Sequence, residues 1–146
     1  MLGPVYCDTS ALLKLYVSEP ESADVTKAIG GREDLVLSDL ALTEIASALS
    51  RRVRLGELTP EAARRTHRTV LDTLESAPYQ RVEMTGDVHR RAEQLLLTMT
   101  TTTGSLRAAD ALHLALALSA GAASMAVFDV RLAAAARAVG LAVYPA

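Results

Sequence analysis

The segment that decides the fold reads LRAADALHLALALSA and occupies residues 106–120. Within residues 108–119 the only ionisable side chains are Asp110 and His113, and all other residues are Ala, Leu or Ser119. A helix that is apolar on nearly all sides is a buried helix, so we expect Asp110 to lie in or beside a core. A buried carboxylate costs free energy unless it is hydrogen-bonded, ion-paired or bound to a cation.

Two interpretations of Asp110 are open at this point. In the first it is a structural acid, stabilised by the helix dipole and satisfied by Arg107 or a nearby hydroxyl. In the second it belongs to a functional group of acids, which requires other carboxylates in equally unsuitable places.

The composition limits the class of protein. A chain of 146 residues is long enough for one domain with its own core, and we expect a single domain over residues 1–146. Apolar residues make up 50% and aromatic residues only 3%, which favours helices packed closely on a small sheet. The net charge of -2 argues against a generally basic nucleic-acid-binding protein.

The single cysteine and the first residues bear on the compartment. Cys7 is the only cysteine, which excludes an intrachain disulfide and a zinc site built on thiolates. The start, MLGPVYCD, has no basic region followed by an apolar one, so we expect no signal peptide. Residues 108–128 are apolar, but Asp110, His113 and Gly121 interrupt them. We therefore expect a soluble, cytoplasmic protein without a membrane partner.

Short apolar runs alternate with helical patterns along the whole chain. The expected strands are residues 5–7, 35–37, 81–84, 124–128 and 141–144. The expected helices are residues 11–16, 19–29, 39–55, 59–76, 85–97, 106–120 and 130–139, with a loop at residues 98–104. This alternation predicts an α/β fold, a small parallel sheet of about four or five strands flanked by helices.

Three more of the 17 acidic residues stand in places where acids are uncommon. Asp8 directly follows the first strand and Asp129 follows the fourth, and such strand ends face the ligand crevice of a parallel sheet. Each also precedes a helix, so capping of that helix is an alternative explanation. Glu44 has Leu40 and Ala48 as neighbours on its helix face, where a solvated surface would carry more charge.

Together the candidate site has four members: Asp8, Glu44, Asp110 and Asp129. If they converge, they cannot all remain ionised without a cation, because neighbouring like charges raise one another's pKa. Carboxylates without cysteine suit a hard ion, Mg²⁺ or Mn²⁺, rather than zinc. The reaction that fits such an ion is hydrolysis of a phosphodiester, because the ion activates water and stabilises the leaving oxygen.

Four segments follow one another in the chain: VYCDTSALLKLY from residue 5, LTEIASAL from residue 42, LRAADALHLALAL from residue 106 and VFDVRLAAAARAVGL from residue 127. The ordered set resembles the PIN-domain ribonucleases, and within them the VapC-type toxins of VapBC toxin–antitoxin systems. The resemblance implies a PIN-like fold and places the family's acidic site on the same four acids. It also matches Thr9 and Ser10 to hydroxyls that support the site. Val127 departs from the usual Thr or Ser, which weakens the support expected for Asp129.

The resemblance also implies a function. It is that of a Mg²⁺- or Mn²⁺-dependent endoribonuclease, the toxin of a type II system, which inhibits translation by cutting a tRNA or rRNA. A homodimer and a cognate VapB-type antitoxin, whose tail occupies the acidic groove, are implied as well. Two other functions stay open, a non-catalytic PIN-fold module that binds RNA or protein, and a metal nuclease that acts on DNA.

Four basic residues complete the predictions. His113 lies one turn after Asp110, and we expect a structural histidine bonded within the core. Arg107 either binds RNA phosphate or pairs with Asp110. Arg51 and Arg52 are further candidates for phosphate contacts. Because aromatic residues are scarce, we expect recognition of RNA by shape and backbone rather than by base stacking.

Overall fold

The computed structural model describes residues 1–99 and 106–145. Within these residues the strands are β1 (Val5–Cys7), β2 (Leu35–Ser38), β3 (Gln80–Val82), β4 (Ser124–Ala126) and β5 (Ala142–Tyr144). The helices are α1 (Thr9–Tyr16), α2 (Ser22–Ile29), α3 (Asp39–Arg54), α4 (Pro60–Ser76), α5 (Gly86–Thr98), α6 (Ala108–Ser119) and α7 (Val130–Ala138). The loop predicted for residues 98–104 does not include Thr98, because this residue belongs to α5. Residues 100–104 of the predicted loop lie outside the described ranges.

The five strands form one parallel sheet in the order β3-β2-β1-β4-β5, which confirms the predicted α/β fold. In the register, Tyr6 of β1 lies beside Val36 of β2 and Met125 of β4. From β1 the chain builds outward to β2 and β3, and it then returns to β4 on the other side of β1. The order therefore reverses beside β1, and a crevice forms at such a point outside the carboxyl ends of the strands.

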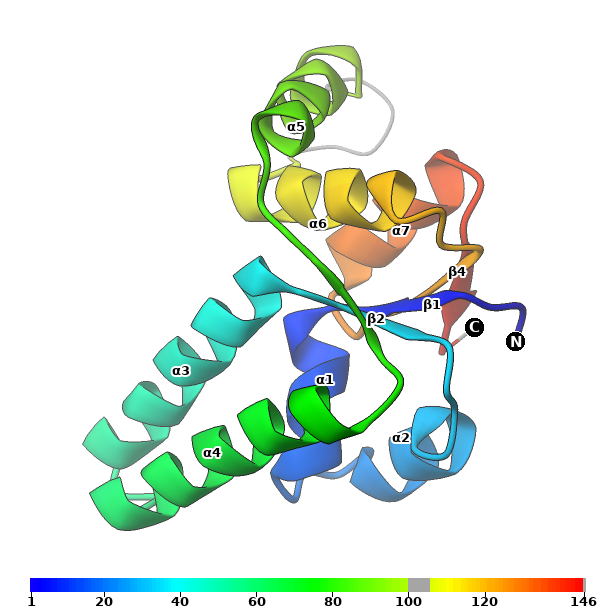
Figure 1. The fold of residues 1–146 in the computed structure, drawn as a ribbon. Helices are drawn as coiled ribbons and strands as arrows, with labels where there is room; N and C mark the ends of the chain where they lie inside the picture. The colour runs from blue at the N-terminus through cyan, green and yellow to red at the C-terminus, as the bar shows by residue number, and fades with distance from the viewer. Residues whose placement is uncertain (100–105, 146) are drawn as a thin grey trace.

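Alternate residues of the inner strands point to opposite faces of the sheet. Tyr6 and Val36 pack in a core with α5, α6 and α7. Val5 and Leu35 pack in a second core with α1, α2, α3 and α4. Figure 1 shows α6 and α7 on one side of the sheet and α1 and α2 on the other. Since both faces are covered, the inner strands β1, β2 and β4 are buried at every residue rather than at alternate ones.

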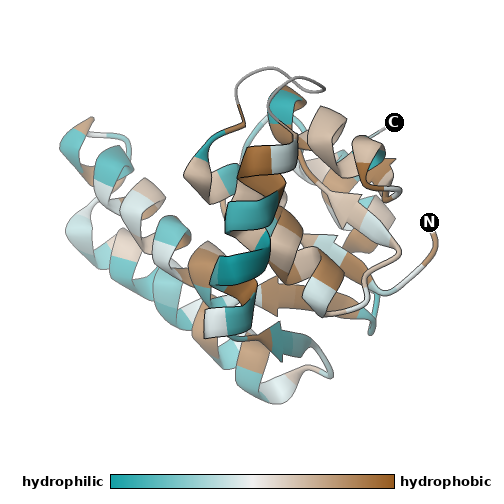
Figure 2. Ribbon diagram, turned by 90° about the horizontal axis from the view of Figure 1, so that it is seen from above, coloured by the Kyte–Doolittle hydropathy of each residue, from teal (hydrophilic) through white to brown (hydrophobic). Residues whose placement is uncertain are grey.

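The helix α6 is buried, as its sequence predicts. Leu114 and Leu116 have no exposed surface, and Asp110 is only 6% exposed. Figure 2 shows mostly brown, apolar residues on the inner strands and more teal, hydrophilic turns on the α3–α4 pair that projects to the left. No helix in residues 1–99 and 106–145 is long and apolar enough to cross a membrane.

Two predicted strands end earlier than their sequences suggested. The strand predicted for residues 124–128 stops at Ala126, because the backbone N–H of Phe128 donates to Ser10 Oγ at 3.0 Å instead of to a strand. The strand predicted for residues 81–84 covers Gln80–Val82, and it is an edge strand that pairs only with β2. The first of these differences joins the backbone of Phe128 to α1.

Leu116→Ala is expected to lower the free energy of unfolding by about 2–5 kcal/mol, because it leaves a cavity in a fully buried helix. The matched control is Leu97→Ala on α5, where the side chain is 79% exposed and the same substitution should change stability by less than about 0.5 kcal/mol. Urea titration followed by circular dichroism measures both. Equal losses in the two variants would contradict the buried position of α6.

Candidate active site

A pocket of about 410 Å³ lies at the carboxyl edge of the sheet. The pocket is lined by residues that were predicted for the site from the sequence: Asp8, Thr9, Ser10, Glu44, Arg107, Asp110 and Asp129. His113 lines it as well. They come from the ends of β1 and β4, from the second turn of α3 and from the start of α6. The structure thus brings the four predicted acids together, while their chemical roles stay a prediction.

Asp8 is the most buried of the four acids, with 4% of its surface exposed. Its Oδ1 accepts hydrogen bonds from the backbone N–H of Ala11 at 2.9 Å and from Ser10 Oγ at 2.7 Å, so it caps α1. Burial raises the pKa of Asp8 to about 6, although these two hydrogen bonds act to lower it. The capping interpretation is correct, and the same carboxylate also faces the pocket.

Asp129 caps α7 in the same way. Its Oδ1 accepts from the backbone N–H of Leu132 at 3.0 Å, and its Oδ2 lies 3.4 Å from an Arg107 guanidinium nitrogen. Val127, where a hydroxyl residue was expected, is 1% exposed and packs in the α5–α7 core. Its side chain has no donor for Asp129, so Arg107 is the side chain that contacts this acid.

Asp110 lies in the first turn of α6. Its Oδ2 accepts from the backbone N–H of Arg107 at 3.1 Å, and the Arg107 Nε lies 3.6 Å away. The pairing of Arg107 with Asp110, one of the two alternatives for this arginine, is therefore seen, and Arg107 also reaches Asp129. The Arg107 side chain is 57% exposed, so it can exchange these weak contacts for another anion.

Glu44 projects from α3 toward α1 and α6. Its Oε1 accepts from Thr9 Oγ1 at 2.7 Å and lies 2.5 Å from His113 Nε2. Burial acts to raise the pKa of Glu44, but the hydrogen bonds from His113 and Thr9 outweigh it, so the pKa lies below its usual value. The expected core bonding of His113 is correct, since Nδ1 lies 2.7 Å from Tyr6 Oη. The contact with Glu44 was not expected.

Each of three acids uses one carboxylate oxygen for these contacts and leaves the other one free. Among residues 1–99 and 106–145, Asp8 Oδ2, Glu44 Oε2 and Asp110 Oδ1 have no hydrogen-bond or ion-pair partner. In the same residues no three Asp, Glu, His or Cys side chains stand close enough together to hold a metal ion. The donor set of carboxylate and hydroxyl oxygens nevertheless has the chemistry that a hard cation requires.

The two arginines predicted on α3 differ in their surroundings. Arg52 forms ion pairs with Glu19 and, at 3.7 Å, with Glu57, so it is already engaged. Arg51 is exposed and, within the described part of the chain, has no ion pair. Both line a pocket of about 310 Å³ that shares Leu13 with the acidic pocket. Arg51 is therefore the better placed of the two for a phosphate contact.

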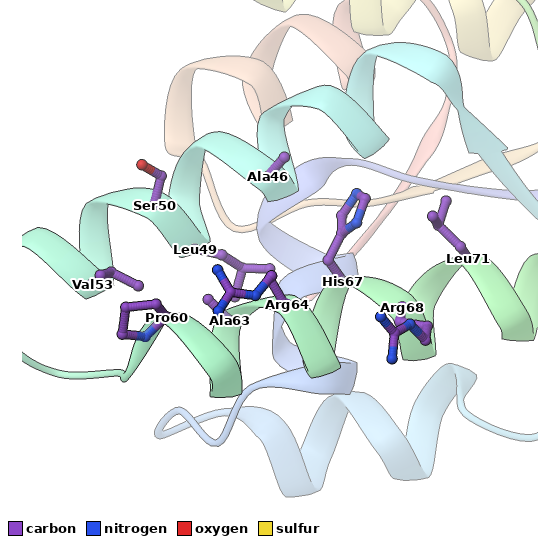
Figure 3. A pocket seen from close by; sticks show the side chains of 10 residues that line it. All are labelled: Ala46, Leu49, Ser50, Val53, Pro60, Ala63, Arg64, His67, Arg68 and Leu71. Carbon is purple, nitrogen blue, oxygen red and sulfur yellow. The ribbon is translucent and has the colours of Figure 1, made fainter.

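A larger cavity of about 510 Å³ lies between α3 and α4 and contains none of the predicted site residues (Figure 3). Leu49, Val53 and Leu71 give it an apolar floor, and Arg64 and Arg68 stand at its side. It has no carboxylate, and Ser50 and His67 are the side chains there that could act as nucleophiles. The acidic pocket, and not this larger cavity, therefore remains the candidate for the predicted chemistry.

Comparisons with known proteins identify the family of the chain. Residues 5–138 match the PIN domain family. The chain is 35% identical to Ribonuclease VapC45 of Mycobacterium tuberculosis (strain CDC 1551 / Oshkosh) over 144 residues, which are 97% of this chain and 95% of that relative.

Solved structures show the same fold. VapC20 of Mycobacterium tuberculosis, described as a sarcin–ricin loop cleaving toxin, superposes with a TM-score of 0.71 at 19% identity and covers 94% of this chain and 95% of its own. A toxin–antitoxin complex from Klebsiella pneumoniae superposes with a TM-score of 0.61 at 18% identity, with 86% of each chain covered. At such identities the two structures support the fold alone.

The match to the family and the alignment to VapC45 both extend over nearly the whole chain, including the segments that carry the four acids. The parallel sheet and its flanking helices agree with the superposed structures. The chain therefore belongs to the PIN-domain family and is a homologue of the VapC ribonucleases.

Proposed function

We propose that the protein is a Mg²⁺- or Mn²⁺-dependent endoribonuclease, the toxin of a type II toxin–antitoxin system, which hydrolyses RNA phosphodiesters at the acidic pocket. The observation that carries the proposal is the convergence of four carboxylates from four separate segments on one pocket. A carboxylate that is buried and has a raised pKa, as Asp8 has, is typical of a functional site.

Asp8, Glu44 and Asp110 would hold the ion through the carboxylate oxygens that no protein group occupies, and binding would draw these side chains closer together than they stand in this structure. A bound ion would activate water for attack on the phosphorus and stabilise the leaving oxygen. It would also neutralise Asp8, whose burial is otherwise costly. Asp129 has both oxygens engaged, by Leu132 and Arg107, and would join the site when Arg107 turns away.

The residues around the acids would orient them and the substrate. Thr9 donates to Glu44, and Ser10 donates to Asp8 while it accepts from the backbone of Phe128. These contacts hold two carboxylates in fixed orientations. Arg107, at the rim of the pocket, is suited to bind a substrate phosphate because its guanidinium can donate two hydrogen bonds to one phosphate group.

The relatives support a proposal for the substrate and the partner. VapC45 is named a ribonuclease, and VapC20 is described as a toxin that cleaves the sarcin–ricin loop. We extend this activity to the present chain and expect a structured tRNA or rRNA, whose cleavage would inhibit translation. Because the Klebsiella structure is a toxin–antitoxin complex, we also propose a VapB-type antitoxin that inserts a basic side chain among the acids, and a homodimeric toxin.

Asp8→Asn and Asp110→Asn are each expected to reduce cleavage of a labelled rRNA fragment in Mg²⁺ by roughly 100-fold or more, the size of effect seen when a group that stabilises transition-state charge is removed. Gel analysis of the products measures this, and EDTA is expected to abolish cleavage by the wild type. The matched control is Asp72→Asn, an exposed acid on α4.

A folded wild type that cuts RNA no faster in Mg²⁺ than in EDTA, and no faster than these variants, would contradict the proposal and support the non-catalytic PIN module. Cleavage of DNA but not of RNA would support the alternative metal nuclease.

Asp8→Asn is expected to stabilise the metal-free protein at neutral pH, because it replaces a buried charge by a neutral group that still caps α1. The pKa of Asp8 rises from 3.8 to about 6 on folding. The folded protein therefore binds this proton more tightly, and the contribution of Asp8 to stability falls as the pH rises from about 4 to about 6.

Urea titrations in EDTA at pH 4 and pH 7 test this expectation. At pH 7 the free energy of unfolding of Asp8→Asn should exceed that of the wild type by about 2 kcal/mol. At pH 4 the free energies of unfolding of the two proteins should agree. Asp72→Asn serves as the control and should show no such dependence on pH. A less stable Asp8→Asn protein at pH 7 would contradict the costly burial of this carboxylate.

A further inference from the structure

We infer that His113, held in place by Tyr6, is a positioning residue that fixes the Glu44 carboxylate so that one of its oxygens faces the acidic pocket. The inference rests on the proposed function and extends it to two residues outside the acidic set. It replaces the purely structural role that the sequence suggested for His113 with a role in the site.

The contacts of His113 form an unbroken polar chain through the core. Its Nε2 lies 2.5 Å from Glu44 Oε1, and its Nδ1 lies 2.7 Å from Tyr6 Oη. Tyr6 Oη lies 2.9 Å from Ser38 Oγ, which accepts from the backbone N–H of Ala41 at 3.0 Å. The chain therefore runs from the first turn of α3, across β1 and α6, and back to Glu44 on α3.

The imidazole is held rigidly in this place. His113 is 4% exposed and Tyr6 is fully buried. Their rings meet edge to face, with centroids 5.8 Å apart and an interplanar angle of 68°. In residues 1–99 and 106–145, no buried side-chain nitrogen or oxygen lacks a hydrogen-bond partner. Any rotation of the ring would break two short hydrogen bonds inside a core, which is costly.

The chemistry of the partners determines where the imidazole carries its proton. An ionised carboxylate only accepts hydrogen bonds, so Nε2 must be the donor to Glu44. The Tyr6 hydroxyl has a single hydrogen, which it donates to Ser38 Oγ, so its oxygen is the atom that faces Nδ1. The arrangement is the one in which a histidine orients a carboxylate through a charge-assisted hydrogen bond.

Two donors, His113 Nε2 and Thr9 Oγ1, take the same oxygen of Glu44. This leaves Oε2 without a partner in the described residues, and the carboxylate lines the pocket. A glutamate side chain has several rotatable bonds, and Thr9 alone would fix only one direction. A histidine whose role was only to fill the core would not have to contact Glu44, a side chain that lines the pocket.

The test uses two amide substitutions of His113, and each of them keeps one of the two hydrogen bonds of the imidazole. Gln places its nitrogen near the position of Nε2 and keeps the donor to Glu44, whereas Asn reaches only the position of Nδ1 and keeps the contact with Tyr6. His113→Asn is expected to weaken Mn²⁺ binding in isothermal titration calorimetry by roughly 10-fold or more, and His113→Gln by no more than about threefold.

The controls separate positioning from stability. His89→Asn, at an exposed site on α5, should leave Mn²⁺ affinity unchanged, and circular dichroism checks that each variant is folded. The half-saturating Mg²⁺ concentration for RNA cleavage should rise in His113→Asn in the same proportion as the Mn²⁺ dissociation constant. A merely structural histidine would instead lower the free energy of unfolding in both amide variants and leave metal affinity unchanged.

A folded His113→Asn protein with wild-type affinity for Mn²⁺, or equal losses in the Asn and Gln variants, would overturn the inference. If His113→Asn does not fold, Tyr6→Phe decides, because it removes the hydroxyl that holds Nδ1 without changing the shape of the core. It should weaken Mn²⁺ binding, and unchanged affinity would overturn the inference. A wild type that binds Mn²⁺ but cleaves no RNA would contradict the proposed function alone.

Discussion

A carboxylate buried at the end of a parallel strand is the constraint on which the rest of the site depends. Asp8 follows β1, is 4% exposed, and has a pKa of about 6 because it is removed from water. The first turn of α1 and the Ser10 hydroxyl compensate part of this cost. Ser10 in turn accepts the backbone N–H of Phe128 and so joins the loop after β1 to the loop after β4. The contacts that end two strands and start a helix are thus the same contacts that place the acid.

Two of the other acids bond one carboxylate oxygen to groups of the protein and leave the second oxygen for the pocket. Asp110 takes the free backbone N–H at the start of α6 and Glu44 takes Thr9 and His113, and each keeps one oxygen for the pocket. Asp129 is the exception, because Leu132 and Arg107 engage both of its oxygens. The buried Val127 beside it supplies no hydrogen bond, so an exposed arginine contacts the acid instead.

The sequence was sufficient for features that depend on neighbours along the chain. The apolar composition of residues 106–120 predicted a buried helix, the alternation of short strands and helices predicted a parallel sheet, and the capping residue Asp129 predicted where α7 begins. The first helix was expected from residue 11 but begins at Thr9, directly after its cap Asp8. Sequence alone did not reveal contacts between distant segments. Glu44 and His113 are 69 positions apart, and their contact depends on how α3 and α6 rotate about their own axes when they pack. The contact of Arg52 with Glu19, 33 positions away, was hidden for the same reason.

The central claim is that the acids of the pocket form one metal-binding site. The most direct measurement is an anomalous difference map from crystals grown with Mn²⁺. The account predicts a peak within coordination distance of carboxylate oxygens of Asp8, Glu44 and Asp110, with the His113 imidazole still bonded to the far oxygen of Glu44. A well-ordered pocket without a peak, or Mn²⁺ bound only elsewhere on the molecule, would contradict the account.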